Sequence, residues 1–189
     1  QGMRLHTVCA GASDRYNSVT CSLPSEKLTY QVALWSPSDP ALYDVMITVY
    51  KGGKPTDHVG SYFALRDYSV KGDKILLNSR PFYARLVLDQ GYWKESGLTP
   101  PDEEALVRDI LLAKEMGFNG ARKHQKIEDE RYFYYADILG FTVWCELPSN
   151  HWFSDASSEQ LTQEWLEIVR SNYNHPSLVT WVIFNESWG

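Results

Sequence analysis

The sequence predicts a multidomain protein of the β plus α/β class, in which a β-sandwich over residues 1–68 is followed by an α/β domain over residues 69–189. The first stretch contains short runs of β-forming residues separated by Pro, Gly, Ser and Asp, and it shows no helical period. After Tyr68, strand-like runs alternate with amphipathic helical patterns in the order β-α-β-α-β-α-β. This order is typical of a parallel sheet with right-handed crossover connections.

The β-sandwich prediction depends on runs rich in β-branched and aromatic residues, at 4–10, 18–23, 28–34, 44–50 and 59–65. A sandwich is the simplest packing for such strands. The glycine pair within Lys51–Pro55 predicts a hairpin turn between the last two runs. Two prolines interrupt the pattern between residues 34 and 43, where we interpret Trp35 and Tyr43 as aromatic residues packing at a corner of the sandwich.

A hairpin over residues 69–77 opens the second domain, whose parallel strands we expect at 82–88, 118–121, 141–144 and 178–184. Helices are expected at about 100–116, 129–139 and 158–172, with these apolar faces: Leu106, Ile110, Ala113 and Met116; Phe133, Ala136 and Leu139; Leu161, Trp165, Ile168 and Val169. The last strand lacks the alternation of a half-exposed strand, which indicates burial on both faces. Such a domain is half of an eight-stranded TIM barrel, (β/α)8, or a complete small open sheet.

Polar or aromatic residues follow each expected parallel strand: Asp89, Tyr92 and Trp93; Arg122 and His124; Glu146; Asn185, Glu186 and Trp188. In a barrel the carboxyl ends of all strands meet at one mouth, where the chemistry takes place. No glycine-rich phosphate loop follows the first strand, and this weakens a nucleotide-binding interpretation.

Composition narrows the function classes. A net charge of −6 and a pI near 5.3 argue against a nucleic-acid partner, and no apolar run is long enough to cross a membrane. The N-terminus lacks a signal-peptide pattern and reads as the middle of a domain, so the compartment stays open. Cys9, Cys21 and Cys145 form no metal-binding spacing, and we expect free thiols, with a Cys9–Cys21 pair as the alternative. No metal or cofactor is predicted.

Several ordered segments resemble glycoside hydrolase family 2: Trp35–Tyr43, Leu77–Phe82, Asp109–Ile110, Lys114–Asn119, Ala121–His124, Leu139–Trp144, Asn174–Ser177 and Phe184–Glu186. The resemblance covers about residues 28–189. It implies an immunoglobulin-like sandwich followed by the first half of a catalytic (β/α)8 barrel. Because the family includes β-galactosidases, β-glucuronidases and β-mannosidases, it also implies a retaining glycosidase with a carbohydrate substrate.

The resemblance assigns roles residue by residue. It places the acid/base role on Glu186 and contact with the sugar 2-hydroxyl on Asn185. Arg122 and His124 match a segment at the edge of the sugar pocket, and Glu146 matches a glutamate that follows the third strand. The family's nucleophile, a glutamate after the seventh strand, falls outside these residues, so only one of the two catalytic carboxylates is expected here.

Alternatives remain for several of these side chains. Arg122 is either a pocket residue or a structural partner of Glu146, in which case both support Glu186. His124 is expected to bind a sugar hydroxyl, the alternative being a structural histidine. Asp89 ends the first strand and is expected to bond a hydroxyl at the same mouth.

Aromatic residues are the expected sugar platforms. Trp188 lies two residues after Glu186, and Trp93 and Trp152 are either further platforms or packing residues. We expect Glu186 to lie among Trp188, Trp144 and Trp152, whose apolar surroundings would disfavour its charged form.

The chain departs from the family pattern at Lys123, Gln125-Lys126, Cys145, Ser79 and Leu86. These changes surround the expected pocket, so they leave the reaction class intact and the sugar identity open. Two other functions compete with a glycosidase fragment. One is a non-catalytic carbohydrate-binding or structural fragment, and the other is a small α/β enzyme such as a phosphate-ester hydrolase, for which no phosphate loop or metal cluster is found. A half barrel would leave strand edges unpaired, so we expect self-association or binding to the missing half.

Overall fold

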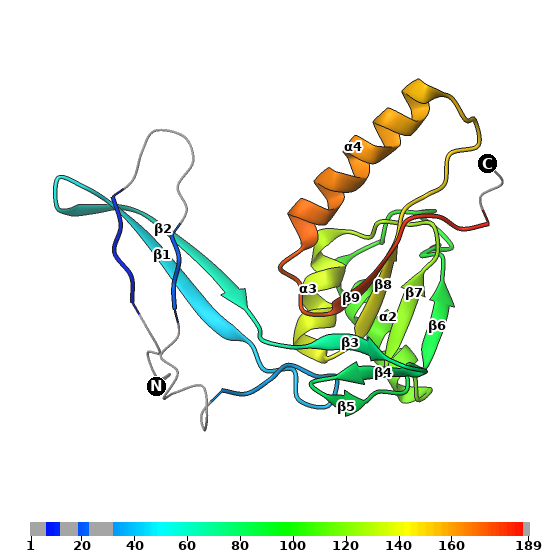
Figure 1. The fold of residues 1–189 in the computed structure, drawn as a ribbon, viewed down its shortest axis with the longest axis horizontal. Coiled ribbons are helices and arrows are strands. Elements are labelled where there is room, and N and C mark those ends of the chain that lie inside the picture. The colour runs from blue at the N-terminus through cyan, green and yellow to red at the C-terminus, as the bar shows by residue number, and fades with distance from the viewer. Residues whose placement is uncertain (1–6, 12–18, 23–31, 187–189) are drawn as a thin grey trace. The chain divides into compact units, whose positions relative to one another are not determined.

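A computed structural model describes residues 7–11, 19–22 and 32–186 (Figure 1). The chain separates into two compact units, residues 1–33 and 34–189. In the first unit, the described residues 7–11 and 19–22 are irregular. The strands expected at 4–10, 18–23 and 28–34 are described only at residues 7–10, 19–22 and 32–34, and none of these residues is in a strand.

The second unit begins with an antiparallel hairpin of β1 (Tyr43–Lys51) and β2 (Lys54–Phe63). Gly52 and Gly53 in its turn have φ of 59° and 78°, a conformation that favours glycine at both positions. The hairpin predicted from this glycine pair is therefore confirmed. Within the predicted sandwich, this hairpin contains the strands β1 and β2 of the described residues.

A small antiparallel sheet follows, with β3 (Tyr68–Lys71), β4 (Lys74–Leu77) and β5 (Arg80–Pro81) in that order. Asn78 and Ser79 form the turn between β4 and β5, with φ of 53° and 64°. The left-handed backbone of Ser79 gives a physical reason why glycine suits this position.

The rest of the unit alternates strands and helices. The strands β6 (Leu86–Asp89), β7 (Gly120–Lys123), β8 (Thr142–Glu146) and β9 (Leu178–Val182) form one parallel sheet in chain order. The helices α2 (Glu103–Glu115), α3 (Glu130–Leu139) and α4 (Asp155–Asn172) connect them. The predicted β-α-β-α-β-α-β order is confirmed.

Capping residues define where the helices start and where α3 ends. The Asp102 carboxylate accepts a hydrogen bond from the Ala105 N–H at 2.7 Å, so α2 begins after Asp102 and not at the preceding prolines. Ser154 and Ser157 form a reciprocal capping box that starts α4. Gly140 ends α3 in the left-handed conformation, with φ of 67°.

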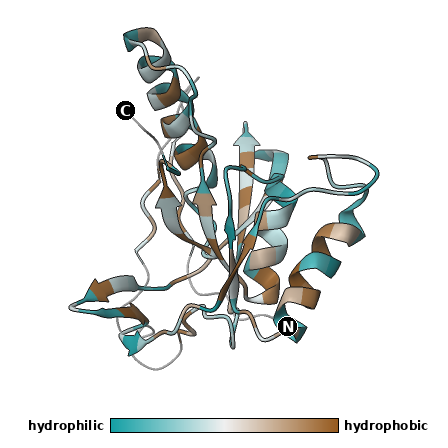
Figure 2. Ribbon diagram, turned by 90° about the vertical axis from the view of Figure 1, so that its right-hand side faces the viewer, coloured by the Kyte–Doolittle hydropathy of each residue, from teal (hydrophilic) through white to brown (hydrophobic). Residues whose placement is uncertain are grey.

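The hydrophobic core lies between one face of the sheet and the two helices α2 and α3 (Figure 1). It is formed by Leu106, Ile110, Ala121, Tyr132, Phe133, Ala136, Phe141, Val143, Cys145 and Leu178. Figure 2 shows that the helices carry both apolar and polar residues, as expected for elements covered on one side.

Three burial predictions are wrong. The residues expected to form the buried face of α4, Leu161, Trp165, Ile168 and Val169, are only half-buried, and the helix extends away from the sheet (Figure 1). Met116 at the end of α2 is 77% exposed. Ile183 and Phe184, expected in a strand covered on both faces, follow β9 and are 45% and 53% exposed. The exposure of Ile183 and Phe184 follows because the described helices cover only one face of the sheet.

Trp35 is fully buried, as expected of a packing residue, but its neighbour differs from the prediction. Its indole N–H donates to the carbonyl of Asp137 on α3 at 2.8 Å, so it packs against the α/β part and not at a sandwich corner. Cys9, Cys21 and Cys145 are free thiols, as predicted. None of the described helices is long and apolar enough to cross a membrane.

Candidate active site

The carboxyl ends of β7, β8 and β9 bring together a cation, a carboxylate and an amide. The guanidinium of Arg122 donates from Nε to Glu146 Oε2 at 2.5 Å and from Nη2 to Asn185 Oδ1 at 2.7 Å. The Glu146 side chain is fully buried, and that of Arg122 is 32% exposed. Arg122 therefore joins the ends of three adjacent strands.

Strand alternation explains this grouping. Val143 and Cys145 point toward the helices and belong to the core, so Trp144 and Glu146 between and after them point to the opposite face. Arg122 is paired in register with Trp144 and shares that face. In a barrel this face is the interior.

The second oxygen of Glu146 is also occupied. The backbone N–H of Gln125 donates to Oε1 at 3.0 Å, and Nε2 of His124 lies 4.0 Å from the same atom. Nδ1 of His124 is 3.1 Å from the Gln90 amide. A fully buried carboxylate held by three groups suits a supporting role better than proton transfer to a substrate.

Asn185 is fixed by the loop after β8. Ser149 Oγ lies 3.3 Å from both the backbone nitrogen and the carbonyl oxygen of Asn185. The next residue, Glu186, is exposed and has φ of 46°, which is unusual for a residue with a side chain. Backbone outliers of this kind concentrate at functional sites.

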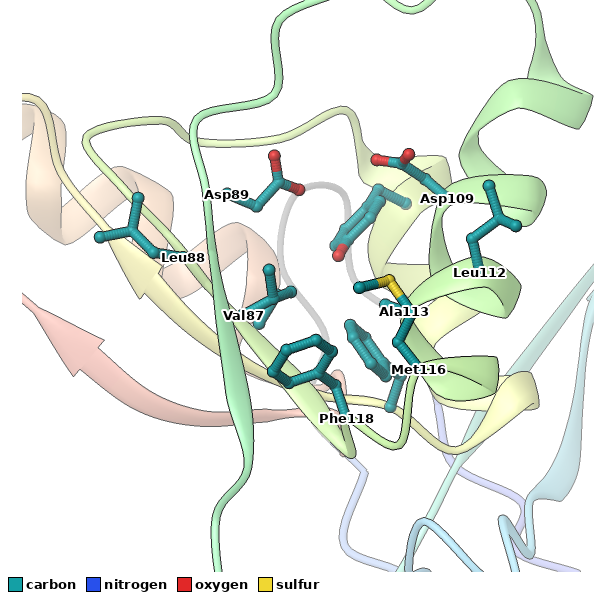
Figure 3. A pocket seen from close by; sticks show the side chains of 11 residues that line it. Val87, Leu88, Asp89, Asp109, Leu112, Ala113, Met116 and Phe118 are labelled. Carbon is teal, nitrogen blue, oxygen red and sulfur yellow. The ribbon is translucent and has the colours of Figure 1, made fainter.

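Asp89 does not join this cluster. Its side chain lies between β6 and α2, beside a cavity of about 230 Å³ (Figure 3). The carboxylate pairs with the ammonium of Lys123 and accepts the N–H of Gly91 at 2.7 Å. Only its backbone carbonyl reaches the mouth, where it accepts the N–H of His124 at 2.8 Å.

Lys123 is a buried cation that sequence reasoning noted only as a departure from a family pattern. It is 1% exposed, lies 2.9 Å from Glu128 Oε1, and sits over the Tyr132 ring at 4.7 Å from its centroid. Lys126 reaches the same Glu128 oxygen at 2.8 Å. The sequence feature that could have indicated this ion pair is Glu128, five positions after Lys123. No spacing rule connects a strand residue with a carboxylate at that separation.

The cavity beside Asp89 affects a second carboxyl group. Asp109 on α2 lines it, and Figure 3 shows both side chains at its upper end. Burial raises the pKa of Asp109, and the nearby Asp89 charge raises it further.

The predicted burial of Glu186 is not found in the described part of the chain. Trp152 is 87% exposed, and Glu186 itself is exposed, so the expected desolvation is absent. Trp188 lies outside the described residues. Trp93 packs against the core, which favours its packing role over a platform role. Within residues 7–11, 19–22 and 32–186, no cluster of metal-ligating side chains is found.

Family comparisons cover nearly the whole chain. Residues 10–66 match the family described as Glycosyl hydrolases family 2, and residues 68–189 match Glycosyl hydrolases family 2, TIM barrel domain. A β-glucuronidase of Bacteroides fragilis is 32% identical over 166 residues, covering 81% of this chain and 24% of the relative. A β-galactosidase of Leuconostoc mesenteroides is 27% identical over 164 residues, covering 82% of this chain and 16% of the relative.

Solved structures give the same picture. A β-glucuronidase of Bacteroides uniformis shares 30% identity with a TM-score of 0.73, covering 82% of this chain and 19% of that chain. A β-galacturonidase from Eisenbergiella tayi, bound to galacturonate, shares 26% identity with a TM-score of 0.78, covering 88% of this chain and 30% of that chain. The chain thus spans less than a third of the length of each of these four proteins.

Proposed function

Because the chain belongs to glycosyl hydrolases family 2, we propose that it supplies the acid/base half of a retaining glycosidase active site. In this proposal, a complete enzyme containing these residues cleaves a terminal sugar by double displacement. Glu186 protonates the leaving oxygen, and a carboxylate from the other half of the barrel attacks the anomeric carbon.

The observation that carries the proposal is the Arg122 bridge. Arg122 binds Glu146 and Asn185 at once, and Asn185 directly precedes Glu186. A guanidinium held by a buried carboxylate cannot swing away freely, so the amide that it contacts is held in one orientation. We propose that Arg122 and Glu146 support Asn185, and that Asn185 binds the sugar 2-hydroxyl beside the acid.

For His124 and the tryptophans near the mouth, we propose direct contact with the sugar. His124 has a side chain that is 17% exposed at the edge of the cluster, which suits contact with a sugar hydroxyl. Trp152 is exposed on the loop after β8, where an indole face would stack on a pyranose ring or on the leaving group. Trp188 keeps its proposed platform role. The Lys123 pairing of Asp89 argues against a sugar contact by that carboxylate.

For the sugar, we propose a β-glucuronide. The two relatives above that are 30% or more identical carry the name β-glucuronidase. The cations of β7 and its following turn do not by themselves favour a uronate, since Arg122, Lys123 and Lys126 are each engaged by carboxylates. A uronate-binding cation would therefore come from another part of the enzyme.

The test uses a longer polypeptide in which these residues are followed by the second half of the barrel. It is assayed on aryl β-glucuronide, β-galacturonide and β-galactoside. Preferred turnover of the β-glucuronide supports the sugar assignment, and turnover of another member supports the reaction class while changing the sugar. Absence of turnover on all of them, in a folded protein, argues for the non-catalytic carbohydrate-binding alternative.

The sheet edges support a proposed partner. In the described residues, β6 and β9 each have one neighbouring strand. The indole N–H of Trp144 is buried without a hydrogen-bond partner among those residues, on the face that becomes a barrel interior. We propose that four further strands complete this sheet, and that the 189-residue chain alone associates with itself through the same edges.

A further inference from the structure

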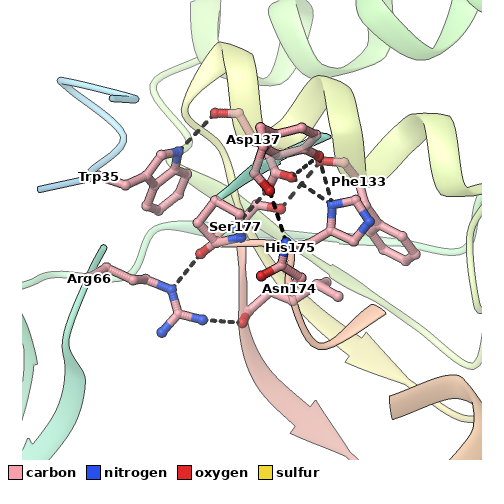
Figure 4. Close-up of polar contacts among 10 residues, drawn as sticks. Trp35, Arg66, Phe133, Asp137, Asn174, His175 and Ser177 are labelled. Carbon is pink, nitrogen blue, oxygen red and sulfur yellow. Dashed lines mark hydrogen bonds and ion pairs between the residues drawn. The ribbon is translucent and has the colours of Figure 1, made fainter. Parts of the chain in front are cut away.

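Asp137 on α3 is a fully buried carboxylate outside the candidate active site (Figure 4). Burying a carboxylate is unfavourable unless hydrogen bonds compensate for lost water. Its Oδ1 accepts the Ser177 N–H at 2.9 Å, and Oδ2 accepts the Tyr62 hydroxyl at 2.7 Å. Nδ1 of His175 is 2.6 Å from Oδ2, and the Asp137 carbonyl accepts the Trp35 indole N–H. Asp137 thus connects β2 with the turn that leads into β9.

A second set of hydrogen bonds joins the same turn to the end of β2 and to the residues that follow β2. Arg66 donates from Nε to the carbonyl of Pro176 and from Nη2 to that of Leu178, both at 2.6 Å. The amide of Asn174 donates to the carbonyl of Tyr62 at 3.0 Å. Leu178 is the first residue of β9, so the start of this strand is fixed before it enters the sheet.

The chemistry of Tyr62 is consistent with a permanent donor. Burial, followed by the hydrogen bond to Asp137, raises the pKa of Tyr62, so its hydroxyl keeps its proton over the whole physiological range. Its ring also lies 5.7 Å from that of Tyr134 and 6.4 Å from that of His175.

The β8–β9 ladder needs such an anchor because its register is irregular. The pairing shifts between Val143 and Trp144, so the hydrogen bonds of the ladder do not define one alignment along its full length. Sliding a strand by one residue turns each side chain to the opposite face. For β9, that slip would remove Asn185 from Arg122.

We propose that the Tyr62–Asp137–His175 cluster is a positioning device through which β2 and α3 set the register of β9 and hold Asn185 against Arg122. Tyr62 and Asp137 are positioning residues that touch neither the cluster at the strand ends nor a substrate. The alignment of β9 does not depend on the proposed activity.

The test compares Tyr62→Phe with Tyr134→Phe in this chain by hydrogen exchange. The first variant removes only the hydroxyl that donates a hydrogen bond to Asp137. The second removes the hydroxyl of the adjacent ring. We expect Tyr62→Phe to lower protection of the Leu178–Val182 amides about tenfold or more, because a buried charged acceptor loses a donor. Protection of Gly120–Lys123 should stay near its original value. Tyr134→Phe should leave both strands unchanged.

A merely structural role has a different signature. If the hydroxyl contributes only to overall stability, β7 and β9 lose protection by the same factor, and the proposal is overturned. Unchanged protection in β9 overturns it as well. Arg66→Lys, which keeps the charge and weakens the two carbonyl contacts, provides the same comparison if Tyr62→Phe does not fold. Because exchange is measured without substrate, failure of this proposal is distinct from failure of the proposed glycosidase function.

Discussion

At the scale of single residues, Glu186 follows an amide that is fixed by Arg122 on one side and by Ser149 on the other. In a polypeptide carrying the complete barrel, we expect Glu186→Gln to slow cleavage about 10²–10⁴-fold for poor leaving groups, since these need a proton from the acid. Activated aryl glycosides should lose less in the glycosylation step. Rates measured across leaving groups of different basicity check this, and an equal loss for all of them would remove Glu186 from the acid role.

Removing the side chain of Arg122 should affect stability, whereas removing that of His124 should affect substrate binding and turnover. Arg122→Ala leaves the fully buried Glu146 without its cation, so we expect unfolding to become easier by about 2–4 kcal/mol. His124→Ala should leave the melting temperature nearly unchanged and should weaken substrate binding and turnover in the complete barrel. Thermal unfolding and steady-state kinetics measure the two effects, with Arg108→Ala on the exposed side of α2 as the control. Reversed outcomes would exchange the two roles.

The adjacent cations Arg122 and Lys123 show how far single residues are predictable. Strand alternation requires them to face opposite sides, but the sequence does not say which one faces the barrel interior. Register decides, because Arg122 pairs with Trp144 while Lys123 pairs with the core residue Cys145. The pairing of Arg122 with Glu146 was therefore one of two alternatives, and the pairing of Lys123 with Asp89 was not foreseen.

At the scale of elements, the packing of α2 on β6 leaves Asp109 in an unfavourable place. Because the folded-state pKa of Asp109 is raised, its ionised carboxylate costs stability above that pKa, and the cost disappears as pH falls toward the unfolded pKa of about 4. Asp109→Asn should raise the melting temperature at pH 7, and the gain should vanish in acid. Glu104→Gln, at an exposed position of the same helix, is the matched control, and melting curves between pH 3.5 and 7 decide the sign. A lower melting temperature at pH 7 would show that attraction to Lys123 outweighs burial.

Element positions followed from local chemistry more reliably than element burial. Caps at Asp102, Asp129 and Ser154 define helix starts within a few residues of their predicted places, since each satisfies free backbone N–H groups. The exposure of α4 was not predictable from its apolar period. A period shows which face seeks burial, whereas the partner for that face has to come from elsewhere in the molecule.

At the scale of the whole molecule, the predicted fold class is confirmed by the family matches and by the parallel sheet, while the boundary at residues 68 and 69 stays a prediction. The order of strands and helices predicted the parallel sheet, and the resemblance to glycoside hydrolase family 2 decided between half of a barrel and a small open sheet. The sandwich was harder to assess, because three of its expected strands are only partly described and the described residues of these three are not in strands.

The isolated 189-residue chain should have no glycosidase activity, because it supplies one of two required carboxylates. Glu146, the other strand-end glutamate, is fully buried against Arg122 and lies on the strand beside β9, so it cannot attack from the opposite face of a sugar. We expect rates several orders of magnitude below those of a complete barrel, and a solution mass above that of one chain. An assay on aryl glycosides and light scattering test the two expectations. Enzyme-like turnover would refute the first, and a stable monomer would refute the second.

The burial of Trp35 has a practical consequence for anyone who shortens the gene. A polypeptide that starts at residue 69 would lose Trp35, Tyr62 and Arg66 together. It would leave a void the size of an indole, which costs about 3–5 kcal/mol when a buried tryptophan is removed, and an Asp137 carboxylate with fewer donors. A cut just before Leu34 keeps all three side chains. The separable unit therefore begins ahead of the hairpin, and swaps between relatives should be joined there.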